Sequence, residues 1–135
     1  MKKDKTLVGN ELIEENIEEL KQSFTDEVLA KTLTTIRKRI LDGGQFVIAI
    51  GTGNSEVNLS VRTANYANKK WFVAYTSFEE ELKGNNNVMS GFLADIGQIL
   101  DMALKSDDIE GVILNPYGNM MTLNKDIIKV IRGSV

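Results

Sequence analysis

Three short segments of this chain are apolar at every position, and this feature restricts its fold more than any other. The segments are Phe46–Ile50, Trp71–Tyr75 and Val112–Leu114. Successive side chains of a β-strand point to opposite faces of the sheet, so a strand that is apolar throughout is buried on both faces. The pattern therefore predicts central strands of a sheet inside the protein. A chain of 135 residues, 42% of them hydrophobic, can bury such a sheet in one domain without disulfides.

Two amphipathic helices are predicted ahead of the first strand, over residues 10–42. In each helix the apolar residues recur at the spacing of one helical face. They are Ile13, Ile17, Leu20 and Phe24 in the first helix, and Leu29, Leu33, Ile36 and Ile40 in the second. Asn10 is a suitable N-cap for the first helix, and Gly43-Gly44 ends the second. Residues 1–9 are polar with little pattern, and we expect them to be flexible.

Residues 46–131 are predicted to form an α/β core that follows this helical hairpin. Residues 57–63 alternate between apolar and polar side chains, as in a strand with one solvated face, and residues 65–70 are typical of a polar turn. Short connections between the first three strands favour an antiparallel meander. The sequence Ser-Phe-Glu-Glu at 77–80 has the form of a capping box, which predicts a short helix.

The last third of the chain is predicted to continue with a helix, a strand hairpin and a final helix. Apolar spacing indicates an amphipathic helix over 92–104. The strand at 112–114 stops at Asn115-Pro116, because proline cannot donate to a ladder, and residues 120–123 are its expected hairpin partner. Asn124 is the expected cap of the last helix.

The connection over 77–110 determines the predicted topology. It is long enough for a crossover that returns the chain parallel to the strand at 71–75. We therefore expect a single domain over 1–135, of the α+β (or α/β) class. Its sheet is mixed, with about five strands, and helices pack against it beside the N-terminal helical hairpin.

Parallel strands at 71–75 and 112–114 would bring two polar steps to the same edge of the sheet. Thr76 and Ser77 follow the first strand, and Asn115, Pro116 and Tyr117 follow the second. Ligands of open α/β sheets favour the crevice beyond the carboxyl ends of parallel strands, and a helix start at Ser77 attracts anions. These residues form the candidate ligand-binding site. The alternative interpretation is structural, with Ser77 as a helix cap and Asn115-Pro116 as a turn.

The sequence predicts no catalytic, metal or cofactor site. It has no histidine and no cysteine, which removes the usual proton-transfer side chain, the thiol nucleophile and the strongest zinc ligands. Gly-Thr-Gly-Asn at 51–54 lacks the further glycine of a dinucleotide fingerprint and the lysine of a Walker loop, so a turn is expected. Carboxylates at 79–81 and 107–108 could do acid–base chemistry in principle. Neighbouring carboxylates on a helix diverge, however, so we expect these groups, with Asp95 and Asp101, on the solvated surface.

Charge and hydropathy limit the classes of partner that we expect for this chain. The chain has 16 basic and 19 acidic residues, a net charge of −3, and its basic residues are scattered. A nucleic-acid binder presents a basic stripe with interleaved aromatics, so no nucleic-acid partner is expected. The sequence has no run of about 18 apolar residues, so no membrane span is predicted. No apolar signal-peptide core follows the basic start. We expect a cytoplasmic protein that does not bind membranes.

Two segments carry a resemblance to a known family. The sequence Trp-Phe-Val-Ala-Tyr-Thr-Ser-Phe-Glu-Glu at 71–80 joins an apolar strand to a Thr-Ser step and a short acidic helix, and Gly-Val-Ile-Leu-Asn-Pro-Tyr-Gly at 111–118 is an apolar strand that ends in Asn-Pro. With the terminal helix at 123–131, they resemble the N-terminal domain of the SseB family, bacterial proteins named for enhanced serine sensitivity. The resemblance implies an α+β or α/β domain without established enzymatic chemistry. It implies no catalytic residue, and the Thr-Ser and Asn-Pro steps are positions of the family pattern.

Three functions are compatible with these observations. The first is a non-enzymatic cytoplasmic protein-interaction or regulatory domain of the SseB type, whose partner is another protein or a second copy. The alternative is a sensor that binds a small anionic ligand in the crevice at Thr76, Ser77 and Asn115. The third is a carboxylate-dependent hydrolase, which needs two acidic side chains at one pocket. The pair Met120-Met121 is either core filling or an adaptable contact surface.

Overall fold

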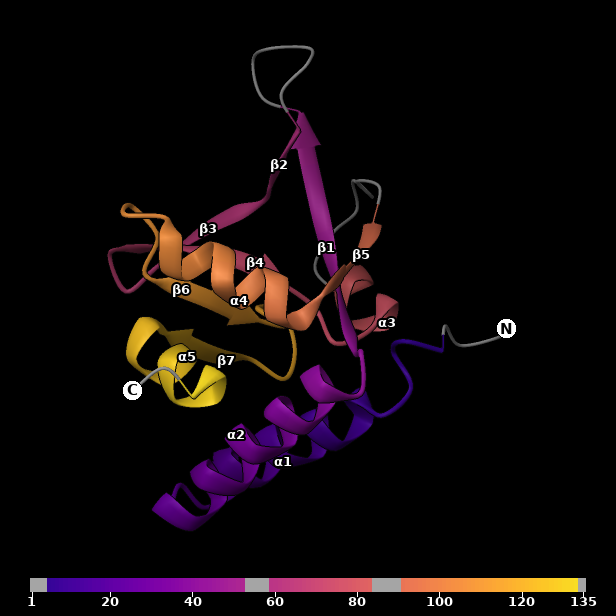
Figure 1. The fold of residues 1–135 in the computed structure, drawn as a ribbon, viewed down its shortest axis with the longest axis vertical. Coiled ribbons are helices and arrows are strands. Elements are labelled where there is room, and N and C mark those ends of the chain that lie inside the picture. Colours follow the sequence, from indigo (N-terminus) through magenta and orange to yellow (C-terminus); the bar gives the residue numbers. More distant parts are fainter. Residues whose placement is uncertain (1–4, 53–58, 84–90, 134–135) are drawn as a thin grey trace.

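A helical hairpin opens the chain and packs against a twisted sheet (Figure 1). Helix α1 spans Asn10–Gln22 and helix α2 spans Asp26–Leu41. The computed structural model describes residues 5–52, 59–83 and 91–133, and the statements below concern these residues. The predicted hairpin over 10–42 is confirmed. The expectation that 1–9 is flexible falls partly outside the described residues, and within them Gln45 N donates to Thr6 O at 3.1 Å.

Two details of the first helix differ from the prediction. The N-cap is Gly9 rather than Asn10, and its φ of 104° is one that glycine adopts readily. Asn10 is instead the first residue of the helix, and it is buried. The sequence predicts Phe24 on the apolar stripe of this helix, but α1 ends at Gln22, and Phe24 lies in the connection with 71% of its surface exposed. Thr25 then caps α2 by accepting a hydrogen bond from Val28 N at 3.1 Å.

The strands of the described residues form two sheets, which share one bridge. Strands β1 (Gln45–Thr52), β2 (Leu59–Val61) and β5 (Gly91–Asp95) form an antiparallel sheet of order β2-β1-β5. Strands β3 (Thr63–Tyr66), β4 (Lys69–Ala74), β6 (Gly111–Leu114) and β7 (Met121–Asn124) form a mixed sheet of order β3-β4-β6-β7. The bridge pairs Val47 with Tyr75 through two hydrogen bonds of 2.8 Å between backbone N and O atoms. The mixed α+β fold class is confirmed, and the strands divide between two sheets.

The crossover between β4 and β6 runs as the sequence predicts. The two strands are parallel, with Trp71 opposite Gly111 and Ala74 opposite Leu114. β7 then pairs antiparallel with β6, and helix α5 (Lys125–Arg132) follows with Asn124 as its cap. Helix α3 (Phe78–Leu82) begins after Ser77, whose hydroxyl accepts from Glu80 N at 3.1 Å.

Two segments adopt a different structure from the predicted one. The helix predicted over 92–104 is strand β5 followed by helix α4 (Ile96–Lys105), because residues 91–95 pair with Gln45–Ala49 of β1. The polar turn predicted over 65–70 is mostly strand, and the chain reverses at Ala67 and Asn68 alone, whose φ angles are 53° and 64°. Positive φ at both central residues is typical of a tight hairpin turn. Of the strand predicted over 57–63, residues 57 and 58 lie outside the described residues.

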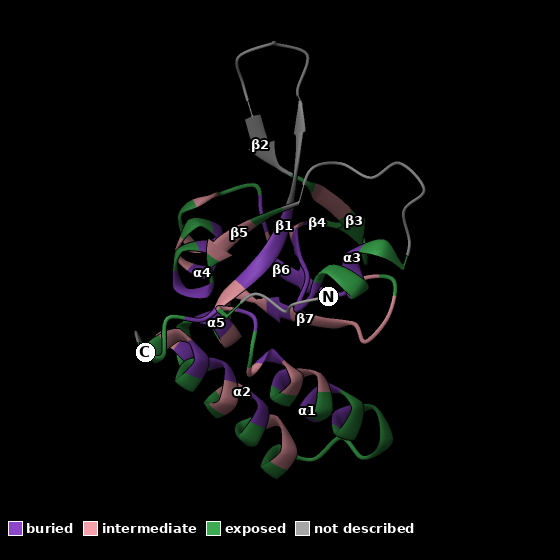
Figure 2. Ribbon diagram, turned by 90° about the vertical axis from the view of Figure 1, so that its right-hand side faces the viewer, coloured by how far each residue is buried: buried purple, intermediate pink, exposed green. Residues whose placement is uncertain are grey.

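The apolar strands are buried on both faces, as predicted (Figure 2). One face, with Ala74, Val112 and Leu114, packs in a core shared with all four longer helices. The opposite face, with Trp71, Val73 and Ile113, packs in a second core that includes Leu7 and Val47. Close strand packing accounts for Gly111, where a Cβ atom would overlap the carbonyl oxygen of Leu123.

Candidate functional site

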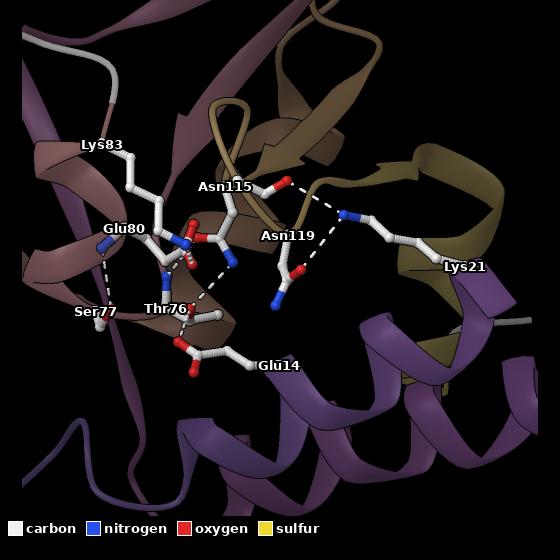
Figure 3. Close-up of polar contacts among 9 residues, drawn as sticks. Glu14, Lys21, Thr76, Ser77, Glu80, Lys83, Asn115 and Asn119 are labelled. Carbon is white, nitrogen blue, oxygen red and sulfur yellow. Dashed lines mark hydrogen bonds and ion pairs between the residues drawn. The ribbon is translucent and has the colours of Figure 1, made fainter.

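The ends of β4 and β6 bring Thr76 and Asn115 into direct contact. The Asn115 side chain accepts a hydrogen bond from Thr76 N at 2.9 Å through Oδ1, and its Nδ2 donates to Thr76 Oγ1 at 3.1 Å. Asn115 has a φ of 51°, a left-handed conformation that asparagine tolerates better than most residues. The predicted juxtaposition of the two polar steps is therefore confirmed (Figure 3).

Both residues are enclosed by the protein rather than lining a crevice. Each is fully buried, and Thr76 Oγ1 also donates to Glu14 Oε2 of α1 at 2.5 Å. The carbonyl oxygen of Thr76 accepts from Asn10 Nδ2 at 3.1 Å, and Asn10 accepts from Arg39 Nε at 3.0 Å. An anion at this position would have to replace these internal bonds. The binding role of Thr76 and Asn115 stays a hypothesis. Their structural role is to join the ends of β4 and β6 to each other and to α1.

The other three predicted site residues lie nearby with different exposures. Ser77 is buried at 8% exposure and caps α3. Pro116 is partly buried, and Tyr117 is half exposed on the loop between β6 and β7. Burial, and then the neighbouring Tyr117, raise the pKa of Tyr75 to about 12. Tyr117 is therefore the member of the predicted set that a partner could reach directly.

The carboxylates of α3 are not on a solvated face, which corrects the prediction for two of them. Glu80 and Glu81 are 5% and 7% exposed, whereas Glu79 is exposed. The loop from β6 to β7 packs onto α3, so closely that a Cβ atom at Gly118 would overlap Glu80 Oε1. That oxygen has no hydrogen-bond partner among the described residues, and Oε2 accepts from Lys83 Nζ at 2.5 Å.

These two carboxylates have different surroundings in the described part of the chain. The partner of Glu80 is a lysine, and its hydrogen bond raises the pKa of Lys83. Burial raises the pKa of Glu81. Asp101 forms an ion pair with Arg132 at 3.0 Å. No group of three or more acidic side chains that could hold a metal ion is found among the residues described.

An apolar groove lies elsewhere, beside strand β7. It has a volume of about 350 Å³, and we call it the β7 groove. Its lining residues come from the end of α1, the start of α2, β7 and α5, and are Ile17, Leu20, Lys21, Phe24, Leu29, Met120, Met121, Thr122 and Ile127. Sequence reasoning missed this groove, although the Met120-Met121 pair was a signal, since one of its two interpretations is a contact surface.

A lysine, Lys21, lies at the β7 groove. Lys21 is exposed, and its Nζ donates to the carbonyl oxygen of Gly118 at 3.2 Å and to Asn119 Oδ1 at 3.4 Å (Figure 3). Both acceptors are neutral. Elsewhere Lys31 pairs with Glu19 at 2.6 Å, and Lys83 pairs with Glu80. Lys21 therefore carries a charge that no carboxylate of the described residues neutralises.

A second groove, of about 410 Å³, is polar, and it is lined by three lysines and three acidic residues. Lys69 lies 3.6 Å from Glu110, and Lys70 lies 3.7 Å from Asp108. Lys125 Nζ donates to the carbonyl oxygen of Ser106 at 2.9 Å. Two of its three lysines are thus paired with carboxylates, whereas Lys125, like Lys21, bonds a neutral oxygen.

Comparison with protein-family models, with curated proteins and with solved structures gives no match. The resemblance to the SseB family therefore remains a prediction from the two sequence segments. No helix among residues 5–52, 59–83 and 91–133 has the length and apolarity that a bilayer crossing requires.

Proposed function

We propose that this chain is a non-enzymatic, cytoplasmic protein-interaction domain of the SseB type, which holds a partner protein in the β7 groove. The observation that carries the proposal is Phe24, a phenylalanine with 71% of its surface exposed at the edge of an apolar groove. Apolar surface that gathers in a groove marks interaction sites on soluble proteins, whereas scattered exposed apolar residues do not.

The composition of the groove supports a protein partner over a small anion. Its lining is mostly aliphatic and aromatic, and it includes Met120 and Met121. Methionine side chains adapt to partners of different shape. By contrast, the polar groups of Thr76 and Asn115 are buried and bonded to each other. The β7 groove is thus the surface where binding would bury apolar area without breaking internal hydrogen bonds.

Site-specific photo-crosslinking in the native cells tests the proposal. A benzoylphenylalanine at position 24 is expected to give a discrete adduct with a partner protein. The matched control is the same group at Leu41, which is 79% exposed and lies outside the groove. Thr122→Arg, which places a long charged side chain at a half-buried strand position of the groove lining, should abolish the adduct while circular dichroism stays unchanged.

Two outcomes would contradict this function. One is an absence of adducts at position 24. The other is a set of adducts shared by position 24 and Leu41, because it would reflect general stickiness of exposed apolar residues. An adduct that survives Thr122→Arg would move the binding surface away from the groove.

A further inference from the structure

We propose that the β7 groove receives an extended segment of the partner, with alternating apolar residues and one acidic residue, and that this segment adds a strand to the free edge of β7. The inference rests on the proposed function and specifies the chemistry of the partner. Three observations carry it: the position of β7 in the sheet, the two walls of the groove, and the charge of Lys21.

The first observation is the sheet edge. Among the described strands, β7 comes last in the order β3-β4-β6-β7 and pairs only with β6. An edge strand presents backbone N–H and C=O groups that can pair with another chain. Recognition by strand addition uses these groups for affinity and takes specificity from pockets for alternate side chains.

The second observation is that β7 itself forms one wall of the groove. Met121 and Thr122 belong to the strand, while Leu20, Phe24 and Leu29 belong to the end of α1, the connection and the start of α2. A strand placed beside β7 would have one face toward these helical residues and the other toward solvent. Since strand side chains alternate between faces, every second residue of the partner would enter the groove and should be apolar.

The third observation is the charge at the groove. Lys21 is the one charged residue among the described residues that line it, and its acceptors are neutral oxygens of the loop at 118–119. A partner carboxylate would supply the missing countercharge. An interfacial charge pair adds specificity and a faster encounter more than affinity. An acidic residue is therefore expected within or beside the apolar residues of the segment.

The test begins with a displayed library of random decapeptides selected on the intact chain and counter-selected on the Thr122→Arg variant. The expected consensus has apolar residues at alternate positions and one Asp or Glu. For the best peptide, Lys21→Glu should weaken binding about fivefold or more, and the loss should shrink as salt is added. Lys38→Glu is the matched control, an exposed lysine of α2 outside the groove, and should leave the affinity unchanged.

Backbone methylation then identifies the binding mode. Two versions of the peptide are N-methylated at alternate residues, one in each register. A strand that pairs through one edge uses only every second N–H, so one version should bind as well as the parent peptide and the other should not bind. Loss in both registers would indicate a bound helix, and retention in both would indicate side-chain binding alone. Either result would overturn strand addition.

Other outcomes separate this inference from the proposed function. A library that yields no binder blocked by Thr122→Arg overturns the strand-addition proposal, while an adduct at position 24 would leave protein binding in place. A dimer in light scattering that Thr122→Arg converts to a monomer would make a second copy the occupant, and would also overturn it. An absent adduct at position 24, with peptides bound as expected, would contradict the cellular function but not the chemistry of the groove.

Discussion

Replacement of Asn115 by alanine should destabilise the fold strongly, because this residue does three things at once. Its Oδ1 is the acceptor for Thr76 N, its Nδ2 donates to Thr76 Oγ1, and its backbone has a φ of 51°. A buried N–H left without an acceptor costs about 1–3 kcal/mol, and the second bond contributes about 1 kcal/mol. The left-handed conformation costs alanine about 1 kcal/mol. The expected loss is about 3–5 kcal/mol, a large part of the about 5–15 kcal/mol that holds a typical domain together.

Urea unfolding measures this loss directly. The chain has a single tryptophan, Trp71, which is 6% exposed in the second core, so its fluorescence should report the loss of tertiary structure. Asn115→Gly should be about 1 kcal/mol less destabilised than Asn115→Ala, since glycine adopts positive φ without strain. Asn119→Ala, which removes only an exposed 3.4 Å contact with Lys21, should change the unfolding free energy by less than about 0.5 kcal/mol. A loss for Asn115→Ala as small as that of Asn119→Ala would refute the reasoning.

Four further predictions concern two glycines and two buried ionisable groups. Gly111→Ala should cost about 3 kcal/mol or more in urea unfolding, because its Cβ atom overlaps the backbone oxygen of Leu123 and β6 must move from β7. Gly43→Ala tests a different cause, since that site is open and only its φ of 80° is strained, and it should cost about 1 kcal/mol. Burial raises the pKa of Glu81, so its contribution to stability is present at acid pH and is lost as the pH rises through that raised pKa. Glu81→Gln should therefore be more stable than the parent near neutral pH in thermal melts, and this advantage should vanish below about pH 4. For Tyr75, with a pKa of about 12, ultraviolet titration should show one of the three tyrosines ionising later than the others, and stability should fall as the pH rises from about 10 towards that value.

Much of the fold follows from local patterns in the sequence. The segments at 71–75 and 112–114 are apolar at each position, and both are buried on two faces in parallel strands. Caps at Ser77 and Asn124 use side chains whose hydrogen bonds reach only three residues along the chain. Such features depend on neighbours in sequence, which is why reasoning from the sequence reaches them.

The errors arise where distant segments decide the structure. The apolar residues at 92–93 fit a helical stripe, but their pairing with β1 makes them a strand. Glu80 and Glu81 belong to a run of charged residues, which is typical of a solvated helix face. They are nevertheless buried, and the loop at Gly118 packs onto their helix. Nothing in a local charge pattern indicates such a contact.

The candidate site shows the same division. The meeting of Thr76 and Asn115 follows from two strand ends and a parallel crossover, so it was predictable. The enclosure of that pair by Glu14 and Asn10 depends on where α1 docks, which no local pattern specifies. The β7 groove was missed because Phe24 continues the spacing of α1, while the helix itself ends before it.

The side chain of Asn10 has a consequence for how the molecule comes apart. One carboxamide bonds to the carbonyl oxygens of Gln45 and Thr76 and accepts from Arg39, so it joins the start of β1, the end of β4 and α2 to the first turn of α1. Separation of the helical pair from the sheet would leave all of these groups without their hydrogen-bond partners in the same event. Amide hydrogen exchange in α1 should then occur only through the global, cooperative opening that also exposes β4, rather than through fraying of the first helix by itself.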